Sequence, residues 1–288
     1  MNIVDRMVLG TAQFGIDYGI ANIIGKPSKK ETFRILELAW EKGIRRFDTA
    51  PSYGSEELLG KFINVNGLGD EAIVLTKIPS LEQQSWDYKK IIRTSIESSL
   101  KNLGGSIEVL FFHNPIDSIL LLKDPDFFND LLNDYPLSTH GVSVYNPHGI
   151  EKLSGCEFEL AFQFPFNVLD QRFEQVKIPQ GNRYARSVFL QGLLASPYGL
   201  RPNTPLELLK LQKEYHDRLA NYNLEPIGFA VSFAALNNAL DYFIIGVDTA
   251  KQLKDILNLD IYKQKDIAIV DELFFNFDEQ WLDPRNWS

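Results

Sequence analysis

Eight short apolar segments recur along the chain and alternate with longer stretches of helical periodicity. The longer stretches, 29–42, 55–63, 88–103 and 206–221, carry apolar residues at three- and four-residue spacings, which indicates helices with one buried face. Strands that alternate with helices favour successive βα units around a parallel sheet. The segments predicted as strands are 7–9, 44–48, 73–77, 109–113, 141–144, 159–163, 186–189 and 242–246.

The length and composition of the chain fit one domain. The chain has 288 residues, of which 44% are apolar, and no low-complexity linker divides it. Single α/β barrels commonly have about this length. We therefore expect one α/β domain over residues 1–288, with the eight predicted strands forming a barrel.

Two local patterns predict how elements begin and end. Ser55 precedes two glutamates, so its hydroxyl is expected to cap the helix at 55–63 while the carboxylates complement the positive helix end. Near the C-terminus, 267–275 is predicted as a helix and 278–288 as extended chain.

Polar residues occur at the same end of five successive predicted strands. Each lies at or just after the C-terminal end of its strand, which is the face where barrel enzymes assemble catalytic groups. Packing alone does not account well for five such residues in succession, so we predict a polar rim above an apolar core. These residues are Asp48, Lys77, His113, Ser143 and Gln163.

The segment 47–54 adds a phenol to this rim. Tyr53 lies five residues after Asp48, where an apolar segment meets a glycine turn. Taken singly, Asp48 could cap a turn, Lys77 could be an exposed charge and His113 could make a structural hydrogen bond. Together, a carboxylate, a phenol, an ammonium and an imidazole that converge predict a proton-donating site.

These residues, with the segment 10–15 before them, resemble the aldo-keto reductase family, and the likeness extends from residue 9 to residue 287. The resemblance implies a (β/α)8 TIM barrel that reduces carbonyl compounds with a nicotinamide cofactor. It implies that Tyr53 donates the proton and that a nearby Lys77 lowers the pKa of Tyr53. Asp48 would hold Lys77 charged, and His113 would orient the substrate carbonyl.

The resemblance also implies contacts to the cofactor from the strand ends and from 244–255. Val144 and Val188 stand where many relatives have asparagine and proline, and Phe189 either touches the nicotinamide ring or fills the core. In 244–255, Thr249 is expected to cap a helix whose free amides suit phosphate. The implied cofactor-binding residues are Gly10, Thr11, Asp48, Ser143, Gln163, Ser187, Phe189, Gly192, Gly246, Thr249, Gln252 and Asp255.

The cofactor that family precedent favours is NADP(H). The sequence shows no clear basic contact for the ribose 2′-phosphate, because Gly246, Val247 and Gln252 occupy the candidate positions. Asp248 adds repulsion, and Lys251 is the side chain that could compensate. NAD(H) therefore stays open as the second choice.

An aromatic rim is expected around the substrate. The resemblance implies that Phe14, Tyr18, Phe112 and Tyr198 bind it, Tyr198 from the Pro- and Gly-rich loop 196–205. Such a rim suits an apolar aldehyde and the face of a sugar equally well. The sequence therefore predicts a small-molecule carbonyl substrate, with a sugar-derived carbonyl as one option, and does not choose between them.

Composition argues against several other classes of protein. The formal charge of −9 comes from scattered acidic residues without a basic stripe, which disfavours nucleic acid as a partner. Apolar runs fall well short of the roughly 20 residues that span a bilayer, and the N-terminus lacks a signal-peptide pattern, so a cytoplasmic protein without membrane contact is expected. Cys156 is the single cysteine, so no intrachain disulfide and no multi-cysteine metal site is expected, and no metal-binding residues are predicted. The oligomeric state stays open.

Two other functions remain open from the sequence. Lys77 at a strand end could form a Schiff base, as in an aldolase-like lyase, although that would leave Asp48 and Tyr53 unexplained as a set. A barrel of this kind could also bind nicotinamide as a sensor or regulatory subunit with little turnover, because fold does not fix function.

Overall fold

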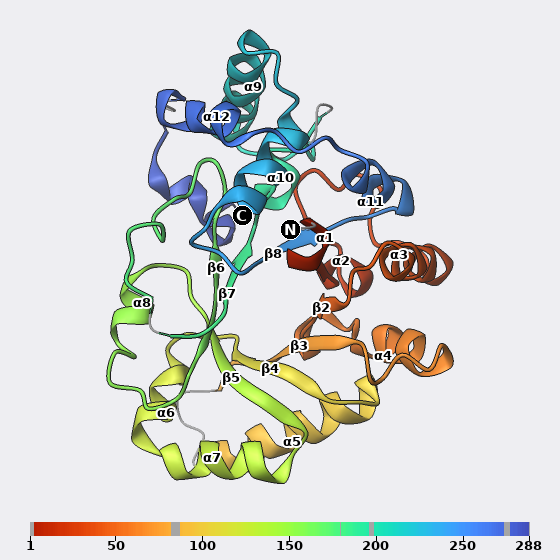
Figure 1. Cartoon of the computed structure of the whole chain (residues 1–288), viewed down its shortest axis with the longest axis vertical. Coiled ribbons are helices and arrows are strands. Elements are labelled where there is room, and N and C mark those ends of the chain that lie inside the picture. The colour runs from red at the N-terminus through yellow and green to blue at the C-terminus, as the bar shows by residue number, and fades with distance from the viewer. Residues whose placement is uncertain (1–2, 82–86, 179, 196–198, 274–276, 288) are drawn as a thin grey trace.

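The computed structural model describes residues 3–81, 87–178, 180–195, 199–273 and 277–287. Eight parallel strands pair in sequence order and close into a barrel (Figure 1). The closure pairs β1 with β8, for example Leu9 with Ile245. The predicted (β/α)8 barrel is confirmed. The strands are β1 Met7–Gly10, β2 Arg46–Asp48, β3 Ile73–Ile78, β4 Ile107–Phe112, β5 Leu137–Ser143, β6 Ala161–Pro165, β7 Arg183–Arg186 and β8 Tyr242–Gly246.

Helices surround this barrel, and the four that the periodicity predicted are α3, α4, α5 and α9. Each buries its apolar stripe; α3, for example, buries Ile35, Leu36 and Ala39 and begins at Ser28, whose side chain accepts a hydrogen bond from the Glu31 amide. The helices are α1 Ile3–Arg6, α2 Ala12–Gly15, α3 Lys29–Glu41, α4 Glu56–Val65, α5 Tyr88–Leu103, α6 Leu120–Lys123, α7 Pro125–Asp134, α8 His148–Glu151, α9 Leu206–Asn221, α10 Pro226–Leu236, α11 Ala250–Leu257 and α12 Gln264–Ile267.

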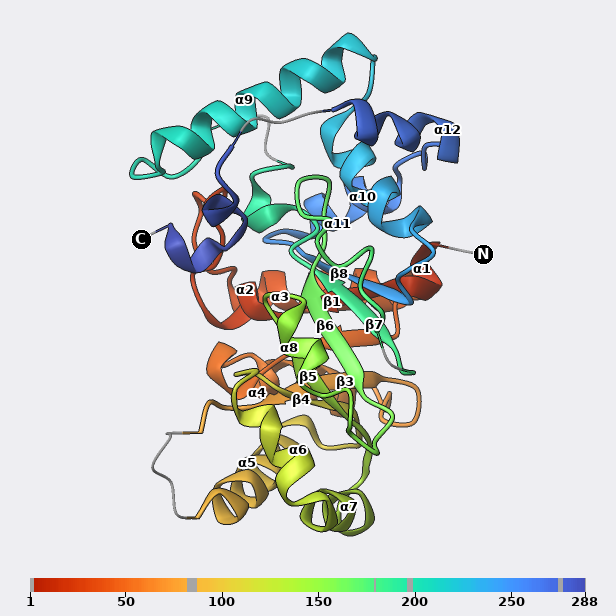
Figure 2. The same cartoon turned by 90° about the vertical axis from the view of Figure 1, so that its left-hand side faces the viewer.

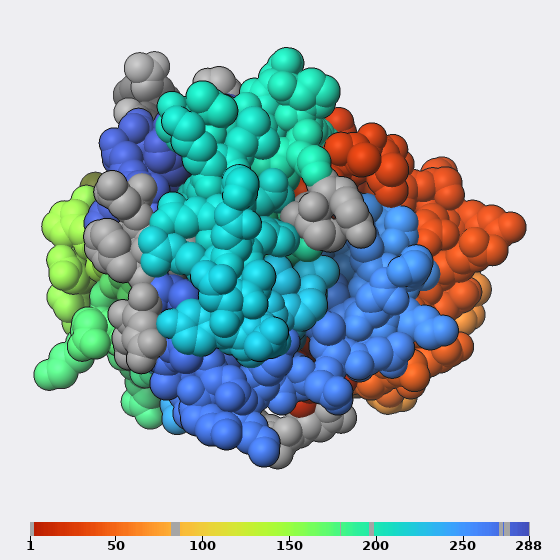
Figure 3. Space-filling view, turned by 90° about the horizontal axis from the view of Figure 1, so that it is seen from above, coloured from red at the N-terminus to blue at the C-terminus, as the bar shows by residue number. Residues whose placement is uncertain are grey.

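The helices are unevenly distributed over the βα units. Between β6 and β7 the described residues contain no helix, whereas α9 and α10 both lie between β7 and β8. Figure 2 shows α9, α10 and α12 together at one end of the molecule, and Figure 3 views that end from above, where α9 forms much of the surface. No helix within the described ranges is long and apolar enough to cross a membrane.

Side chains inside the barrel form an apolar floor beneath a polar layer. The floor is a buried cluster of Val8, Leu75, Val109, Phe111, Ala161 and Tyr184. Successive side chains of a strand point to opposite faces, so a residue two positions further along points the same way. Lys77, Gln163 and Arg186 each lie two positions after a member of the floor, which directs them into the barrel at its C-terminal end.

Two predicted boundaries are wrong. The seventh strand covers Arg183–Arg186 instead of 186–189, because Ser187 has a left-handed backbone with a φ of 59° that ends the strand. The segment predicted as extended chain forms two 3-10 turns, η5 Glu279–Leu282 and η6 Pro284–Asn286.

Aspartates at the start of each turn explain the second difference. The carboxylates of Asp278 and Asp283 accept hydrogen bonds from the amides of Gln280 and Arg285, both at 3.0 Å. The predicted helix at 267–275 corresponds to the end of α12 and the 3-10 helix η4 Ala268–Glu272, while 274–276 lie outside the described residues.

Candidate active site

A buried ion pair lies at the centre of the polar layer. The Lys77 ammonium donates to both oxygens of Asp48, at 2.8 and 2.9 Å, and to the Thr49 carbonyl at 2.9 Å. The side chains of Lys77 and Asp48 are only 1% and 7% exposed. Gln163 from β6 donates its amide to the same carboxylate at 2.7 Å. Three strands, β2, β3 and β6, thus fix one carboxylate in place.

Tyr53 stands over this pair, at the end of the 3-10 turn η1 Pro51–Tyr53. The Lys77 nitrogen lies 4.9 Å from the centroid of the Tyr53 ring. The His113 ring meets the Tyr53 ring edge to face, with their centroids 6.0 Å apart. The structure therefore brings together all four residues of the predicted proton-donating site.

The environment keeps both Tyr53 and His113 neutral near pH 7. Burial raises the pKa of Tyr53 well above its usual value, and the charge of Asp48 raises it further, while Arg186 acts in the opposite direction. Burial lowers the pKa of His113 to about 4, and the charge of Lys77 contributes in the same direction. The predicted lowering of the Tyr53 pKa is therefore wrong: Asp48 neutralises Lys77, and burial dominates.

A cluster of buried hydroxyls supports the site from below. The Thr11 hydroxyl donates to the Asp48 carbonyl at 3.0 Å and lies 2.8 Å from the Ser55 hydroxyl, which is 3.1 Å from that of Thr49. Ser55 makes no side-chain cap for α4, so the predicted cap is wrong. Glu56 and Glu57 do lie in the first turn of α4, and Glu56 is buried and accepts a hydrogen bond from Thr76 at 2.7 Å.

A pocket of about 580 Å³ opens beside Asp48 and Tyr53. Several strand ends contribute to it, and it continues to α11 and the residues that follow α11. Its lining includes most of the residues that the resemblance implied. These are Gly10, Tyr18, Asp48, Tyr53, Gln163, Ser187, Phe189, Gly192, Gly246, Gln252 and Asp255.

Other residues implied as contacts lie elsewhere. Phe14 and Phe112 are fully buried in the hydrophobic core and do not line this pocket, which corrects the expected substrate rim. Phe112 follows Phe111, whose side chain points into the barrel, so Phe112 points outward to the helices. Tyr198 lies outside the described residues.

Three of the implied cofactor contacts do not face the pocket. Thr11 belongs to the buried hydroxyl cluster, and the Thr249 hydroxyl caps α11 by accepting from the Gln252 amide at 3.1 Å. The predicted cap of α11 is thus confirmed, but both hydroxyls are occupied within the protein. Ser143 is buried and pairs in register with Gln163 on the neighbouring strand, without lining the pocket.

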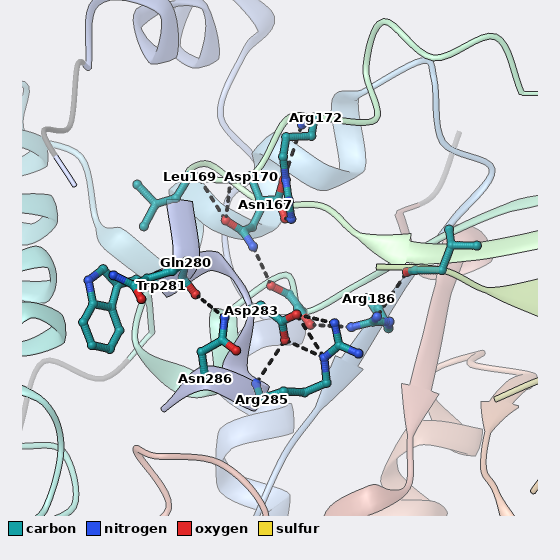
Figure 4. A network of polar contacts seen from close by, with 12 residues as sticks. Asn167, Leu169, Asp170, Arg172, Arg186, Gln280, Trp281, Asp283, Arg285 and Asn286 are labelled. Atoms are coloured by element: carbon teal, nitrogen blue, oxygen red, sulfur yellow. Dashed lines mark hydrogen bonds and ion pairs between the residues drawn. The ribbon is translucent and has the colours of Figure 1, made fainter. Parts of the chain in front are cut away.

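The sequence patterns did not reveal Arg186, which lines the pocket together with Tyr53 and Asp48. Arg186 donates to the Val144 carbonyl at 3.2 Å and lies over one face of Tyr145, with its guanidinium carbon 4.2 Å from the ring centroid. Arg285 lies 3.6 Å from the centroid of the same ring and pairs with Asp283 (Figure 4). A strand boundary placed three residues too late concealed that Arg186 points inward, as Tyr184 does.

The segment from Ser187 to Gly192 lines the pocket with a strained backbone. Ser187, Leu190 and Gln191 have φ angles of 59°, 44° and 54°, which are uncommon for residues other than glycine. Asn167 holds the start of this segment, because its side-chain amide donates to the Ser187 carbonyl at 3.0 Å (Figure 4). Strain of this kind clusters at functional sites.

Glycines at two strand ends beside the pocket let neighbouring side chains pack against the backbone. A Cβ on Gly246 would lie 2.3 Å from the Gln13 amide nitrogen, and a Cβ on Gly10 would lie 3.0 Å from Ile244. A long pocket with a fixed carboxylate at one end fits a dinucleotide. No group of three or more potential metal ligands lies close together within the described ranges.

The closed (β/α)8 barrel, with a buried Lys77–Asp48 pair beside a long pocket at its C-terminal end, has the architecture of a barrel enzyme. A model of the aldo/keto reductase family matches residues 6–274. The chain belongs to this family and is an NAD(P)H-dependent oxidoreductase.

Individual relatives agree with this membership. The chain is 34% identical to the oxidoreductase YrpG of Bacillus subtilis, with 88% of this chain and 86% of the relative covered. It is 33% identical to a D-threo-aldose 1-dehydrogenase of a Pseudomonas species, over 37% of this chain and 41% of that one. A glycerol dehydrogenase of Gluconobacter oxydans shares the fold, with a TM-score of 0.72, 20% identity and coverage of 93% and 90%.

Proposed function

We propose that the chain reduces an aldehyde or ketone to an alcohol, with Tyr53 as the proton donor. The observation that carries this proposal is the placement of a neutral phenol against a buried Lys77–Asp48 pair, at the mouth of a dinucleotide-shaped pocket. A bound nicotinamide dinucleotide supplies the hydride. Gly10, Gln163 and Gly246, which line that pocket, would hold it.

Tyr53 and His113 have different roles at the carbonyl oxygen: His113 orients it and Tyr53 protonates it. The neutral His113 ring carries one N–H group that can donate a hydrogen bond to the oxygen and so orient the carbonyl. As negative charge develops on that oxygen, the Tyr53 hydroxyl transfers its proton there. The raised pKa of Tyr53 keeps this proton in place until an alkoxide, a much stronger base, accepts it.

Lys77 then stabilises the Tyr53 phenolate that remains after the proton transfer. The phenolate of Tyr53 forms in a buried site, where desolvation disfavours the charge. The Lys77 ammonium, 4.9 Å from the ring centroid, would oppose this penalty together with Arg186, whose charge also favours the phenolate. Asp48 keeps the ammonium charged and in position through two hydrogen bonds. Because Lys77 donates all three protons to oxygen acceptors, it is a poor candidate for a Schiff-base nucleophile.

A sugar-derived carbonyl is the substrate that we propose within this class. Tyr18, Arg186 and Gln191 line the pocket and offer hydrogen-bonding groups of the kind that recognise hydroxyls. The aldose dehydrogenase of Pseudomonas among the relatives supports this choice. Family precedent favours NADP(H), and a preference for it would require a basic group or free amides near the ribose 2′-phosphate.

The test is the oxidation of NADH and NADPH, followed by absorbance with a panel of aldehydes, ketones and keto-sugars. Wild type and Tyr53→Phe are compared, since the substitution removes the proton donor and leaves the pocket lining otherwise unchanged. We expect turnover that falls by about 100-fold or more in Tyr53→Phe. Tight dinucleotide binding without turnover of any carbonyl would contradict the reductase and favour a regulatory role.

A further inference from the structure

The far end of the pocket, at α11, decides which dinucleotide the protein accepts. This inference rests on the proposed function, because Tyr53 and Asp48 fix the end of the pocket where the nicotinamide must lie. The pocket runs from these residues to Gln252, Asp255 and Leu259. The adenosine half, with the ribose 2′ position that distinguishes NAD(H) from NADP(H), therefore belongs at the α11 end.

Carboxylates predominate in the lining at that end. Asp248, Asp255 and Glu225 all line the pocket. One oxygen of Asp248, Oδ1, is buried and has no hydrogen-bond partner in the part of the chain that the structure describes. Burial also raises the pKa of Asp248. Oδ1 is closed to the pocket, whereas Asp248 as a whole is only half-buried, so a bound ligand would reach the other carboxylate oxygen, Oδ2.

The cations near this end are already paired. Lys251, the side chain that could have compensated for Asp248, is 83% exposed and pairs with Asp255 at 2.6 Å. Arg201 pairs with Asp17 and donates to the Asn22 carbonyl at 2.9 Å. Arg186, which does line the pocket, is held at its opposite end, over the Tyr145 ring.

Four amides at the start of α11 are occupied as well. The Gln252 side-chain oxygen accepts from the amides of Asp248 and Thr249 at 2.7 and 3.3 Å, and Thr249 accepts from the Gln252 amide. α11 packs beside α3 (Figures 1 and 3), and Glu31 of α3 accepts from the Ala250 amide at 2.8 Å. The protein's own side chains thus satisfy four of the amides that were expected to be available for phosphate.

A 2′-phosphate at this end of the pocket would thus find these backbone amides already hydrogen-bonded, and it would lie near negatively charged carboxylates. It carries a charge of about −1.5 to −2 near neutral pH, so each nearby carboxylate repels it. A ribose 2′-hydroxyl is instead neutral, and the more exposed oxygen of Asp248, Oδ2, can accept its hydrogen bond. We infer that Asp248 makes this protein selective for NAD(H) over NADP(H), by accepting a hydrogen bond from the adenosine ribose and repelling the 2′-phosphate.

The test measures binding directly by isothermal titration calorimetry with NADH and NADPH, without any carbonyl substrate. Three proteins are compared: wild type, Asp248→Asn and Asp70→Asn. Asp248→Asn keeps the size of the side chain and removes its charge. Asp70 is exposed and lies in the loop between α4 and β3, so Asp70→Asn makes the same change in net charge away from the pocket. Thermal unfolding checks that both variants are folded.

Wild type should bind NADH more tightly than NADPH by about 10-fold or more. Asp248→Asn should narrow this ratio by about 10-fold, chiefly through tighter NADPH binding, while Asp70→Asn keeps the wild-type ratio. Wild type that binds NADPH as tightly as NADH would overturn the inference and leave the proposed reductase intact. A preference for NADH that is the same in wild type and Asp248→Asn would also overturn the inference. Failure to bind either dinucleotide would overturn the proposed function itself.

Discussion

Lys77 has an environment in which a single change should be unusually damaging. Its ammonium is buried and donates three hydrogen bonds, two of them to Asp48. Removing one partner of a buried pair leaves the other charge without compensation, which costs more than the pair contributed. The pair is therefore a structural requirement as well as a part of the proposed chemistry.

We predict that Lys77→Met lowers the free energy of unfolding by about 3–5 kcal/mol. Adding Asp48→Asn should restore part of that loss, because the neutral amide no longer needs a cation and can still accept from Gln163. Urea denaturation of the two single variants and the double variant forms the cycle that checks this. Strictly additive effects would show that the two groups do not interact.

The sequence predicted the site residues that follow strand ends better than it predicted their neighbours. Asp48, Lys77 and Gln163 could be found because core packing rarely places a polar residue at the end of an apolar strand. Phe112 was misassigned because its direction depends on the two-residue alternation, which places Phe111 inside the barrel. The role of Asp248 was visible as a charge, but the occupied amides around it depend on Glu31, more than 200 residues away in sequence.

At the scale of elements, α2 and η1 are locked together through Gly15. A Cβ on Gly15 would lie 1.6 Å from the Tyr53 carbonyl oxygen, so no other residue fits without moving the backbone that carries Tyr53. The segment 10–15 thus positions the proposed proton donor, although the donor lies almost 40 residues later in the chain.

Gly15→Ala should therefore destabilise the fold by about 1–3 kcal/mol and reduce carbonyl turnover. Gly69→Ala is the matched control, since a Cβ on Gly69 meets nothing within 4 Å and its φ is not positive. Thermal unfolding and turnover are measured for both. Equal behaviour of the two variants would refute the close approach at Gly15.

The sequence patterns did not predict those helices and turns that lack a local sequence signal. α10 is buried on all sides, with residues from Gly228 to Ala235 in the core, so its sequence lacks the polar face that reveals a surface helix. It packs against α9, α11, α12 and β8, which only the complete fold provides. The C-terminal turns were missed for a different reason, because each depends on an aspartate that bonds to an amide two residues ahead.

At the scale of the molecule, the two ends of the chain share one barrel. β1 and β8 pair over four residues, from Met7 with Phe243 to Gly10 with Gly246. A division of the chain would break this pairing and the continuous core around it. We therefore propose that residues 1–288 form a single domain that unfolds as one unit.

Two buried histidines should make this stability depend on pH. Burial lowers the pKa of His113 and of His140 to about 4, and His140 keeps a 2.9 Å hydrogen bond to the Phe128 carbonyl. The unfolded chain binds protons at these residues near pH 6.5, whereas the folded chain does not until about pH 4. The contribution of these two histidines to the free energy of unfolding is therefore present above pH 6.5 and is lost as the pH falls from 6.5 to about 4.

Urea denaturation of wild type and His140→Gln at pH 7.5 and pH 4.5 checks this dependence. The variant retains a side-chain N–H donor that does not titrate, so wild type should lose about 2–3 kcal/mol more than the variant on acidification. His148→Gln changes an exposed histidine and should behave like wild type. An equal loss in wild type and His140→Gln would mean that His140 does not titrate in this range.

The most direct test of the central claim is single-turnover kinetics with saturating reduced dinucleotide and an accepted carbonyl substrate. Dinucleotide affinity is measured beside the rate, so that binding and chemistry are separated. For Tyr53→Phe we predict unchanged dinucleotide affinity and a rate of reduction that falls by about 100-fold or more. A wild-type rate in a folded Tyr53→Phe protein would show that the proton comes from another group and would contradict the proposed mechanism.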